Sequence, residues 1–204
     1  PLIVVECKSD NVTINPADPD SVWLAVRMGL FRSSDQGHTW KDMEIGRFSP
    51  TTYGRDIRIS PVEPNTLYSA LSVAAASHDG GLYRSEDGGE SWKNISDHPG
   101  LPLQPWGKVG VSISAADPKR IYAMIEARAG GLYRSDDGGE TWEAVNRGSG
   151  IQQRPWYYFR VYADPTEKDT VYVLNVLYYR SSDGGKTLAP SSAMHSDHHD
   201  MWID

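Results

Sequence analysis

Short apolar and β-branched runs alternate with turn-forming residues along the whole chain. The first run of each repeating unit lies at Val12–Asn15, Ile57–Ser60, Val111–Ser114 and Phe159–Tyr162. A Pro-bearing turn follows each of them, at Asp18-Pro19, Glu63-Pro64, Asp117-Pro118 and Asp164-Pro165. The next β-rich runs are Val22–Val26, Thr66–Tyr68, Ile121–Met124 and Thr170–Leu174. No segment of helical length shows a 3.6-residue period, so the pattern predicts an all-β chain.

One motif, Ser-x-Asp-x-Gly-x-x-aromatic, occurs four times and follows an aromatic–Arg pair each time. Its positions are Ser33, Asp35, Gly37 and Trp40; Ser85, Asp87, Gly89 and Trp92; Ser135, Asp137, Gly139 and Trp142; and Ser181, Asp183 and Gly185, with Leu188 in the aromatic place. The aspartates are 46 to 52 residues apart, which is close to the length of one four-stranded propeller blade. The spacing predicts a β-propeller of four-stranded antiparallel blades.

The residue types of the motif suit a tight hairpin turn. Ser hydroxyls and Asp carboxylates cap the unpaired backbone N–H groups of such turns, and Gly adopts positive φ at little steric cost. The closing Trp is large enough to pack between adjacent sheets. We therefore expect a structural role, because identical turns in every blade cannot converge on one catalytic or calcium site.

The motif resembles the Asp-box, or BNR, repeat of sialidases, some glycoside hydrolases, sortilin-type receptor domains and a photosystem II assembly factor. The chain is most similar to bacterial proteins labelled BNR-repeat glycosyl hydrolase, and the stretches Tyr53–Ser60 and His198–Asp204 share this resemblance. The resemblance implies a ligand site on the face away from the boxes. It also implies an extracellular or periplasmic (secreted) protein, although the chain contains no signal peptide. It does not imply an activity, because fold does not determine function.

The predicted domain is a single propeller over residues 1–204. Its blades are expected at about 10–45, 55–97, 108–147 and 157–190, with 199–204 as the first strand of a further blade. Since propellers have about four to eight blades, we expect part of a larger propeller. The remaining blades would come from a longer chain or a second copy, and closure as a four-bladed ring is the alternative.

Charge and composition exclude several classes of partner. The formal net charge is −7 and no run of Lys or Arg occurs, so the chain lacks the basic surface of a nucleic-acid-binding protein. No apolar stretch approaches the roughly 20 residues of a membrane span. Cys7 is the only cysteine, so no intrachain disulfide is possible. No cofactor is indicated.

Chemistry is expected in the loops opposite the boxes, since binding groups concentrate on loops of rigid scaffolds. The blade-joining loops and the loops between second and third strands, such as Val73–Gly80 with His78 and Asp79, form this face. The predicted ligand-binding residues are Arg55, Trp106, Arg128, Arg154, Trp156 and Tyr157. Aromatic rings would stack on a sugar while charged groups bond its hydroxyls. The alternatives are that Trp106 and Trp156 are packing residues and that the arginines hold loops in place through salt bridges.

Asp56, Glu126 and Asp200 are the candidate catalytic acids, because glycoside hydrolysis uses a pair of carboxyl groups. Sialidases use three arginines and a Tyr/Glu pair, which cannot be mapped onto this chain. His198 and Asp200 are candidate metal ligands, because alternate residues of a strand share a face. The alternative for the cluster His195–Asp200 is a polar segment before a strand, with hydrogen-bonded histidines.

Three functions remain open from the sequence. The first is an Asp-box module that binds a glycan or protein ligand. The second is a glycoside hydrolase, and the third is an assembly or scaffold factor with a protein client.

Overall fold

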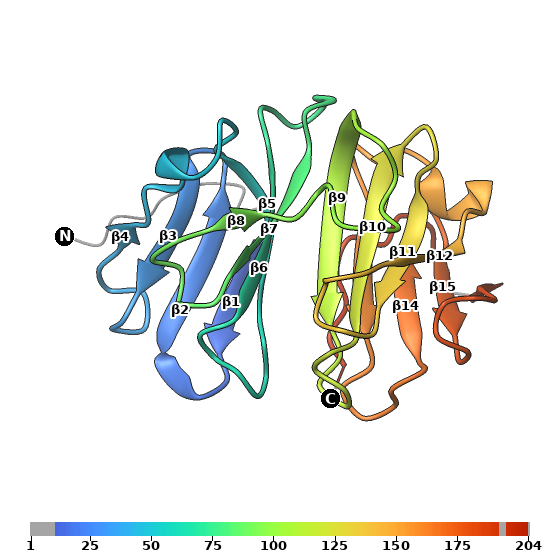
Figure 1. Ribbon diagram of the computed structural model, residues 1–204. Coiled ribbons are helices and arrows are strands. Elements are labelled where there is room, and N and C mark those ends of the chain that lie inside the picture. The colour runs from blue at the N-terminus through green and yellow to red at the C-terminus, as the bar shows by residue number, and fades with distance from the viewer. Residues whose placement is uncertain (1–10, 192–194, 204) are drawn as a thin grey trace.

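Sixteen strands form four separate antiparallel sheets in the computed structural model, which describes residues 11–191 and 195–203. Each sheet contains four strands in chain order, and the sheets follow one another as blades (Figure 1). This confirms the predicted all-β propeller with four-stranded blades. No helix within the described ranges is long and apolar enough to cross a membrane.

The strand bounds show the same layout in each blade. Blade 1 contains β1 (Asn11–Asn15), β2 (Asp18–Val26), β3 (Gly29–Ser33) and β4 (Lys41–Asp42). Blade 2 contains β5 (Tyr53–Ile59), β6 (Leu67–Ser72), β7 (Gly81–Ser85) and β8 (Lys93–Asn94). Blade 3 contains β9 (Trp106–Ile113), β10 (Ile121–Ala127), β11 (Gly131–Ser135) and β12 (Glu143–Asn146). Blade 4 contains β13 (Arg160–Ala163), β14 (Val171–Leu174), β15 (Tyr178–Ser181) and β16 (Ala189–Pro190). Two 3-10 helices, η1 (Ile45–Arg47) and η2 (Ser149–Gln152), lie in loops between blades.

The hydrophobic core lies between consecutive blades. Alternate residues of β6 face opposite neighbours: Leu67 and Leu71 pack with blade 1, whereas Tyr68 and Ala70 pack with blade 3. The same period of two sends Tyr122 of β10 toward blade 4. A middle blade is therefore buried on both faces, which is why its strands read as nearly continuous apolar runs.

The first face of blade 1 has no such neighbour within the described residues. Val12 and Ile14 of β1 are 53% and 58% exposed, whereas Ile57 at the equivalent place in β5 is fully buried. Trp40 is also exposed, while the box tryptophans Trp92 and Trp142 are buried. No junction like those between consecutive blades joins blade 4 to blade 1 in the described ranges. The four blades thus form an open arc (Figure 1).

Each Asp box closes the hairpin between the third and fourth strands of its blade through side-chain hydrogen bonds. In the first box, the Ser33 hydroxyl donates to the Asp35 carboxylate (2.7 Å) and accepts from the Gly37 N–H (2.8 Å). The same carboxylate accepts from the Thr39 N–H (2.8 Å) and hydroxyl (2.6 Å). Equivalent bonds recur in the other three boxes.

The boxes also couple the blades to one another. Gly89 of the second box lies so close to Trp23 of blade 1 that a Cβ there would sit 2.2 Å from the indole. Further along, the Gly138 carbonyl accepts hydrogen bonds from Tyr68 (2.7 Å) and Arg84 (3.0 Å) of the preceding blade. Arg134 donates in the same way to the Gly184 carbonyl (3.1 Å). In blades 2 and 3, the Arg of the repeated aromatic–Arg pair thus contacts the next box along the chain, whereas Arg32 of blade 1 donates to Ser21 of its own blade (3.2 Å).

The predicted first strand of a fifth blade lies partly within the described residues. Met201–Ile203 have no ladder partner among those residues. Leu2–Cys7 and Asp204 lie outside them. The fifth blade therefore stays a prediction.

The contact between box and neighbouring blade predicts that Gly89→Ala destabilises the fold by about 2–4 kcal/mol, from overpacking plus a left-handed backbone. Gly89 has φ of 86° and its Cβ would meet Trp23. Gly88→Ala is the matched control, because it has φ of 72° but meets only the Asn65 side chain, at 3.4 Å. Urea unfolding of both variants measures the difference, and an equal loss would show that the clash with Trp23 contributes nothing.

The box carboxylates also predict a dependence of stability on pH. Hydrogen bonds from the Thr39 and Ser33 hydroxyls lower the pKa of Asp35 from 3.8 to about 2, and bonds from Thr187 and Ser181 lower the pKa of Asp183 to about 2. A lowered pKa in the folded state stabilises the fold above the unfolded value, and this contribution is lost as pH falls through the folded value. The free energy of unfolding should therefore decrease between about pH 4 and pH 2.

Asp35→Asn, which retains an acceptor oxygen, should flatten this decrease, and denaturant titrations across that pH range measure it. Glu63→Gln removes an exposed carboxylate outside the boxes and serves as the control. A slope that is the same in the Asp35 variant and the wild type would contradict the assignment.

Candidate functional site

The loops at the end of the blades opposite the Asp boxes form the candidate functional face. The boxes join the third and fourth strands, so the connections β4–β5, β6–β7, β8–β9, β10–β11 and β12–β13 all lie at the other end. Segment 195–199 reaches this end as well, because the Asp197 and His198 N–H groups donate to the Val176 and Asn175 carbonyls in the β14–β15 loop. Three features stand out on this side: a cleft, an aromatic cluster and a buried ion pair in the channel.

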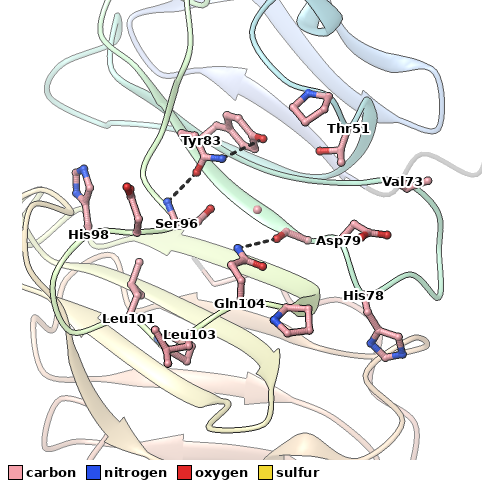
Figure 2. A pocket seen from close by; sticks show the side chains of 17 residues that line it. Thr51, Val73, His78, Asp79, Tyr83, Ser96, His98, Leu101, Leu103 and Gln104 are labelled. Atoms are coloured by element: carbon pink, nitrogen blue, oxygen red, sulfur yellow. Dashed lines mark hydrogen bonds between the residues drawn. The ribbon is translucent and has the colours of Figure 1, made fainter.

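A cleft of about 1120 Å³ opens on blade 2 (Figure 2). Its lining comes from the end of the β4–β5 loop, the β6–β7 loop, the start of β7 and the β8–β9 loop. The residues that the argument below uses are Val73, His78, Asp79, Tyr83, Ser96, Asp97, Leu101, Leu103 and Gln104. We call it the blade 2 cleft.

The floor of the blade 2 cleft is fixed by internal hydrogen bonds (Figure 2). The Asn94 amide donates to the Tyr83 hydroxyl (3.3 Å) and accepts from the Ser96 N–H (2.8 Å). The Gln104 amide donates to the Gly80 carbonyl (3.2 Å) and accepts from the Trp106 N–H (2.9 Å). These polar groups hold the walls in place and leave little bonding capacity for a ligand.

An aromatic cluster lies at the start of blade 4. Trp156 and Tyr157 are 56% and 50% exposed, and their ring centroids are 5.5 Å apart. His199 contacts Tyr157 edge-on at 4.7 Å, so the C-terminal segment packs against this loop. Arg154, with φ of 45°, begins the turn that presents the two rings and accepts the Tyr157 N–H at its carbonyl (2.9 Å). We call Trp156 and Tyr157 the aromatic platform.

The central channel contains a charged pair where the inner strands meet. Arg58 of β5 lies 3.1 Å from the Asp56 carboxylate and 5.3 Å from the ring of Tyr162 in β13. The Tyr162 hydroxyl donates to Asp200 (2.5 Å). Burial, together with this bond to a carboxylate, raises the pKa of Tyr162 to about 12. The Asp56 carboxylate, with other nearby negative groups, raises the pKa of Arg58 against the opposing effect of burial.

The three candidate catalytic acids occupy different environments. Asp56 is buried and also accepts the Val111 N–H of blade 3 (3.0 Å), so its oxygens link two blades. A β-bulge between Gly54 and Asp56 sets this orientation. Glu126 accepts the Lys108 N–H (2.8 Å) at the end of β10. Asp200 is exposed in the channel and bonded to Tyr162. The structure brings Asp56 and Asp200 to the same channel and places Glu126 elsewhere.

The predicted ligand-binding residues divide into buried and exposed groups. Trp106 is fully buried and its indole donates to the Pro102 carbonyl (3.0 Å), so no face of the ring is open to a ligand. Arg55 is buried with its guanidinium 5.1 Å from the Tyr53 ring. Arg128 and Arg154 are exposed on the candidate functional face, as are the two rings of the aromatic platform.

The candidate metal ligands have separate neighbours. His198 stacks on His195 at 4.8 Å and contacts Tyr178 edge-on at 5.3 Å, whereas Asp200 bonds Tyr162. Over residues 11–191 and 195–203, no group of three His, Cys, Asp or Glu side chains has the arrangement to hold a metal ion. A metal at His198 and Asp200 therefore stays a sequence-based prediction.

Sequence reasoning placed the loops of the blade 2 cleft, such as Val73–Gly80, on the binding face, but it did not single out the cleft itself or the channel position of Arg58. A signal for the cleft exists in the proline-rich run 99–105, which cannot form a strand and builds one wall. Arg58 lies between the apolar residues Ile57 and Ile59 of a buried inner strand that also contains Arg55 and Asp56. Such a charge inside a buried strand is itself a signal, because buried charges need partners.

The chain is similar to BNR-repeat proteins and to glycoside hydrolases of family GH74. A sequence profile described as BNR/Asp-box repeat matches residues 133–144. A protein of Neosartorya fischeri named "Probable oligoxyloglucan-reducing end-specific xyloglucanase" is 32% identical over 96 residues, which is 47% of this chain and 11% of the relative. A xyloglucanase of Paenibacillus sp is 28% identical over 105 residues, 44% of this chain and 10% of the relative.

The crystal structure of an ancestral GH74 enzyme shares the fold. Its TM-score is 0.63 at 17% identity, and the match covers 88% of this chain and 23% of that enzyme. The chain thus matches about a tenth of the length of the curated relatives and about a quarter of the solved enzyme. The four boxes, the four-stranded blades and these similarities agree with one another. The chain thus carries the BNR/Asp-box repeat and has the fold of a β-propeller with four-stranded blades.

Proposed function

We propose that this part of the propeller binds a glycan on the face opposite the Asp boxes, with the aromatic platform as its main contact. The observation that carries the proposal is the exposure of two adjacent rings, Trp156 and Tyr157, on that face. Aromatic rings have large apolar surfaces, and contact of these surfaces with water is unfavourable. A ligand that covers the two exposed rings removes this unfavourable contact. The apolar face of a sugar ring fits such a surface.

The surroundings of the platform supply polar groups for sugar hydroxyls. Arg154 and His199 adjoin the rings and are exposed, and Asp197 lies in the same segment as His199. The similarity to proteins named xyloglucanases supports xyloglucan as the glycan, with oligoxyloglucan as the first candidate. An extracellular or periplasmic location agrees with such a ligand.

The platform predicts a loss of glycan affinity on removal of its rings. The double variant Trp156→Ala/Tyr157→Ala should bind xyloglucan oligosaccharides roughly tenfold more weakly, because each stacking contact contributes about 0.5–1.5 kcal/mol. Isothermal titration calorimetry measures the change. Trp202→Ala is the matched control, since Trp202 is also an exposed tryptophan but lies outside the platform. Equal weakening by the control, or no binding by the wild type, would contradict the proposal.

The second candidate function is glycoside hydrolysis, and the observation that favours it is Asp200. Its carboxylate lies exposed in the channel, bonded to Tyr162 and within electrostatic reach of Arg58. A carboxyl group held in this way is a candidate acid or base, and its partner would be Asp56, Glu126 or a residue from another blade. The similarity to named xyloglucanases points to the same chemistry.

If the chain hydrolyses xyloglucan, Asp200→Asn should lower the release of reducing sugar by at least about a hundredfold, the usual loss for a general acid or base. Glu63→Gln is the control, because Glu63 is an exposed carboxylate in the β5–β6 turn at the box end, away from the channel and the aromatic platform. Equal rates for the two variants would exclude Asp200 from catalysis. If the chain binds xyloglucan but releases no reducing sugar, the proposed glycan-binding function remains and hydrolysis is excluded. If it neither binds xyloglucan nor releases reducing sugar, the result favours a scaffold role.

A further inference from the structure

We propose that the blade 2 cleft is a second binding site, for an extended peptide that combines apolar side chains with lysine or arginine. The cleft is on blade 2, whereas the aromatic platform is on the loop that enters blade 4. The inference therefore does not depend on glycan binding.

The walls of the cleft expose apolar side chains. Leu103 is 90% exposed and lies beside the half-buried Leu101, while the exposed Val73 lies across the cleft on the β6–β7 loop (Figure 2). Prolines at positions 50, 102 and 105 add rigid apolar surface. Leu103 and Val73 are too exposed to stabilise this chain by their own burial, so their apolar area is available to a ligand.

The charge on the rim has one sign. The lining contains the carboxylates of Asp79 and Asp97 and includes no lysine or arginine. Neither carboxylate forms a hydrogen bond or ion pair with another residue of the described ranges, and both are exposed. The lining also contains two imidazoles, the exposed His78 and the half-buried His98, of which His98 is bonded to the Gly139 carbonyl (2.6 Å). The two free carboxylates are acceptors, and they favour a ligand with cationic donors.

The same lining disfavours a sugar. Tyr83 is the one Phe, Tyr or Trp ring among the described lining residues, and it is buried with its hydroxyl already bonded to Ser49 (2.8 Å). The floor amides are also occupied, so a sugar, whose recognition needs hydrogen bonds to its hydroxyls, finds few partners there. A peptide can keep its backbone at the open side of the cleft and contact the apolar walls and the two rim carboxylates with its side chains. At about 1120 Å³ the cleft exceeds the usual 300–1,000 Å³ of small-molecule pockets. An extended peptide fits this combination of size, apolar walls and acidic rim.

The test measures fluorescence anisotropy of a short fluorescein-labelled peptide of leucine, serine and lysine, with a peptide carrying glutamate for lysine as its counterpart. The wild-type chain should bind the lysine peptide and not the glutamate peptide. Asp79→Asn/Asp97→Asn should raise the Kd roughly fivefold to tenfold, because two exposed charge contacts are lost. Val73→Ser/Leu103→Ser should weaken binding by a similar factor, and both positions are exposed enough to leave the fold intact.

Two controls separate site binding from attraction to the net negative charge. Glu63→Gln/Glu167→Gln removes the same number of exposed charges from the turns at the box end and should leave the Kd unchanged. Trp156→Ala/Tyr157→Ala should also leave it unchanged, which distinguishes this site from the glycan site. The proposal is overturned if the glutamate peptide binds equally well, if the two charge variants behave alike, or if xyloglucan oligosaccharide displaces the peptide.

Discussion

The packing of each blade against the box of the next is the interaction on which this structure depends. A four-stranded sheet with apolar residues on both faces cannot be stable alone in water, and it gains stability by covering a neighbour. The contact of Trp23 with Gly89 shows how close this approach is, because even one methyl group would not fit. At the next junction, the hydrogen bonds from Arg84 and Tyr68 to the Gly138 carbonyl fix the orientation of blade 2 relative to the box of blade 3.

This constraint also explains why chemistry is expected at the other end of the blades. The box residues make three kinds of contact. They form the hydrogen bonds of their own hairpin turn, they contact side chains of the preceding blade, and in the second and third boxes they position the buried closing tryptophan. The loops at the opposite end make none of these contacts, so their lengths and sequences can differ from blade to blade. A cleft on blade 2 and an aromatic platform before blade 4 can therefore coexist on one rigid scaffold.

The sequence predicts the two ends of the blades to different degrees. The fold could be predicted because the box acts locally: Ser33, Asp35 and Gly37 bond within one turn, and the motif repeats with the blade. The candidate site could be predicted only as a face. The burial of Trp106 depends on the Pro102 carbonyl, and the orientation of Asp56 depends on a bulge and on a strand of the next blade. Neither dependence has a signature in the linear sequence, because the Pro102 carbonyl lies in a loop that does not repeat and the Val111 N–H meets Asp56 only when two blades pack together.

The Arg-to-box contact has a consequence for how such propellers change over time. Arg84 and Arg134 make equivalent bonds to the boxes of their successors, so the junctions of blades 2 and 3 and of blades 3 and 4 use the same donor and the same acceptor. Arg32 of blade 1 instead donates to Ser21 of its own blade (3.2 Å). Arg180 holds the corresponding place in blade 4 and is exposed. A duplication or deletion of a repeat that carries this bond therefore leaves its neighbours with a compatible partner. Gene rearrangement can alter the circumference of the ring in single-blade steps without any compensating point mutation.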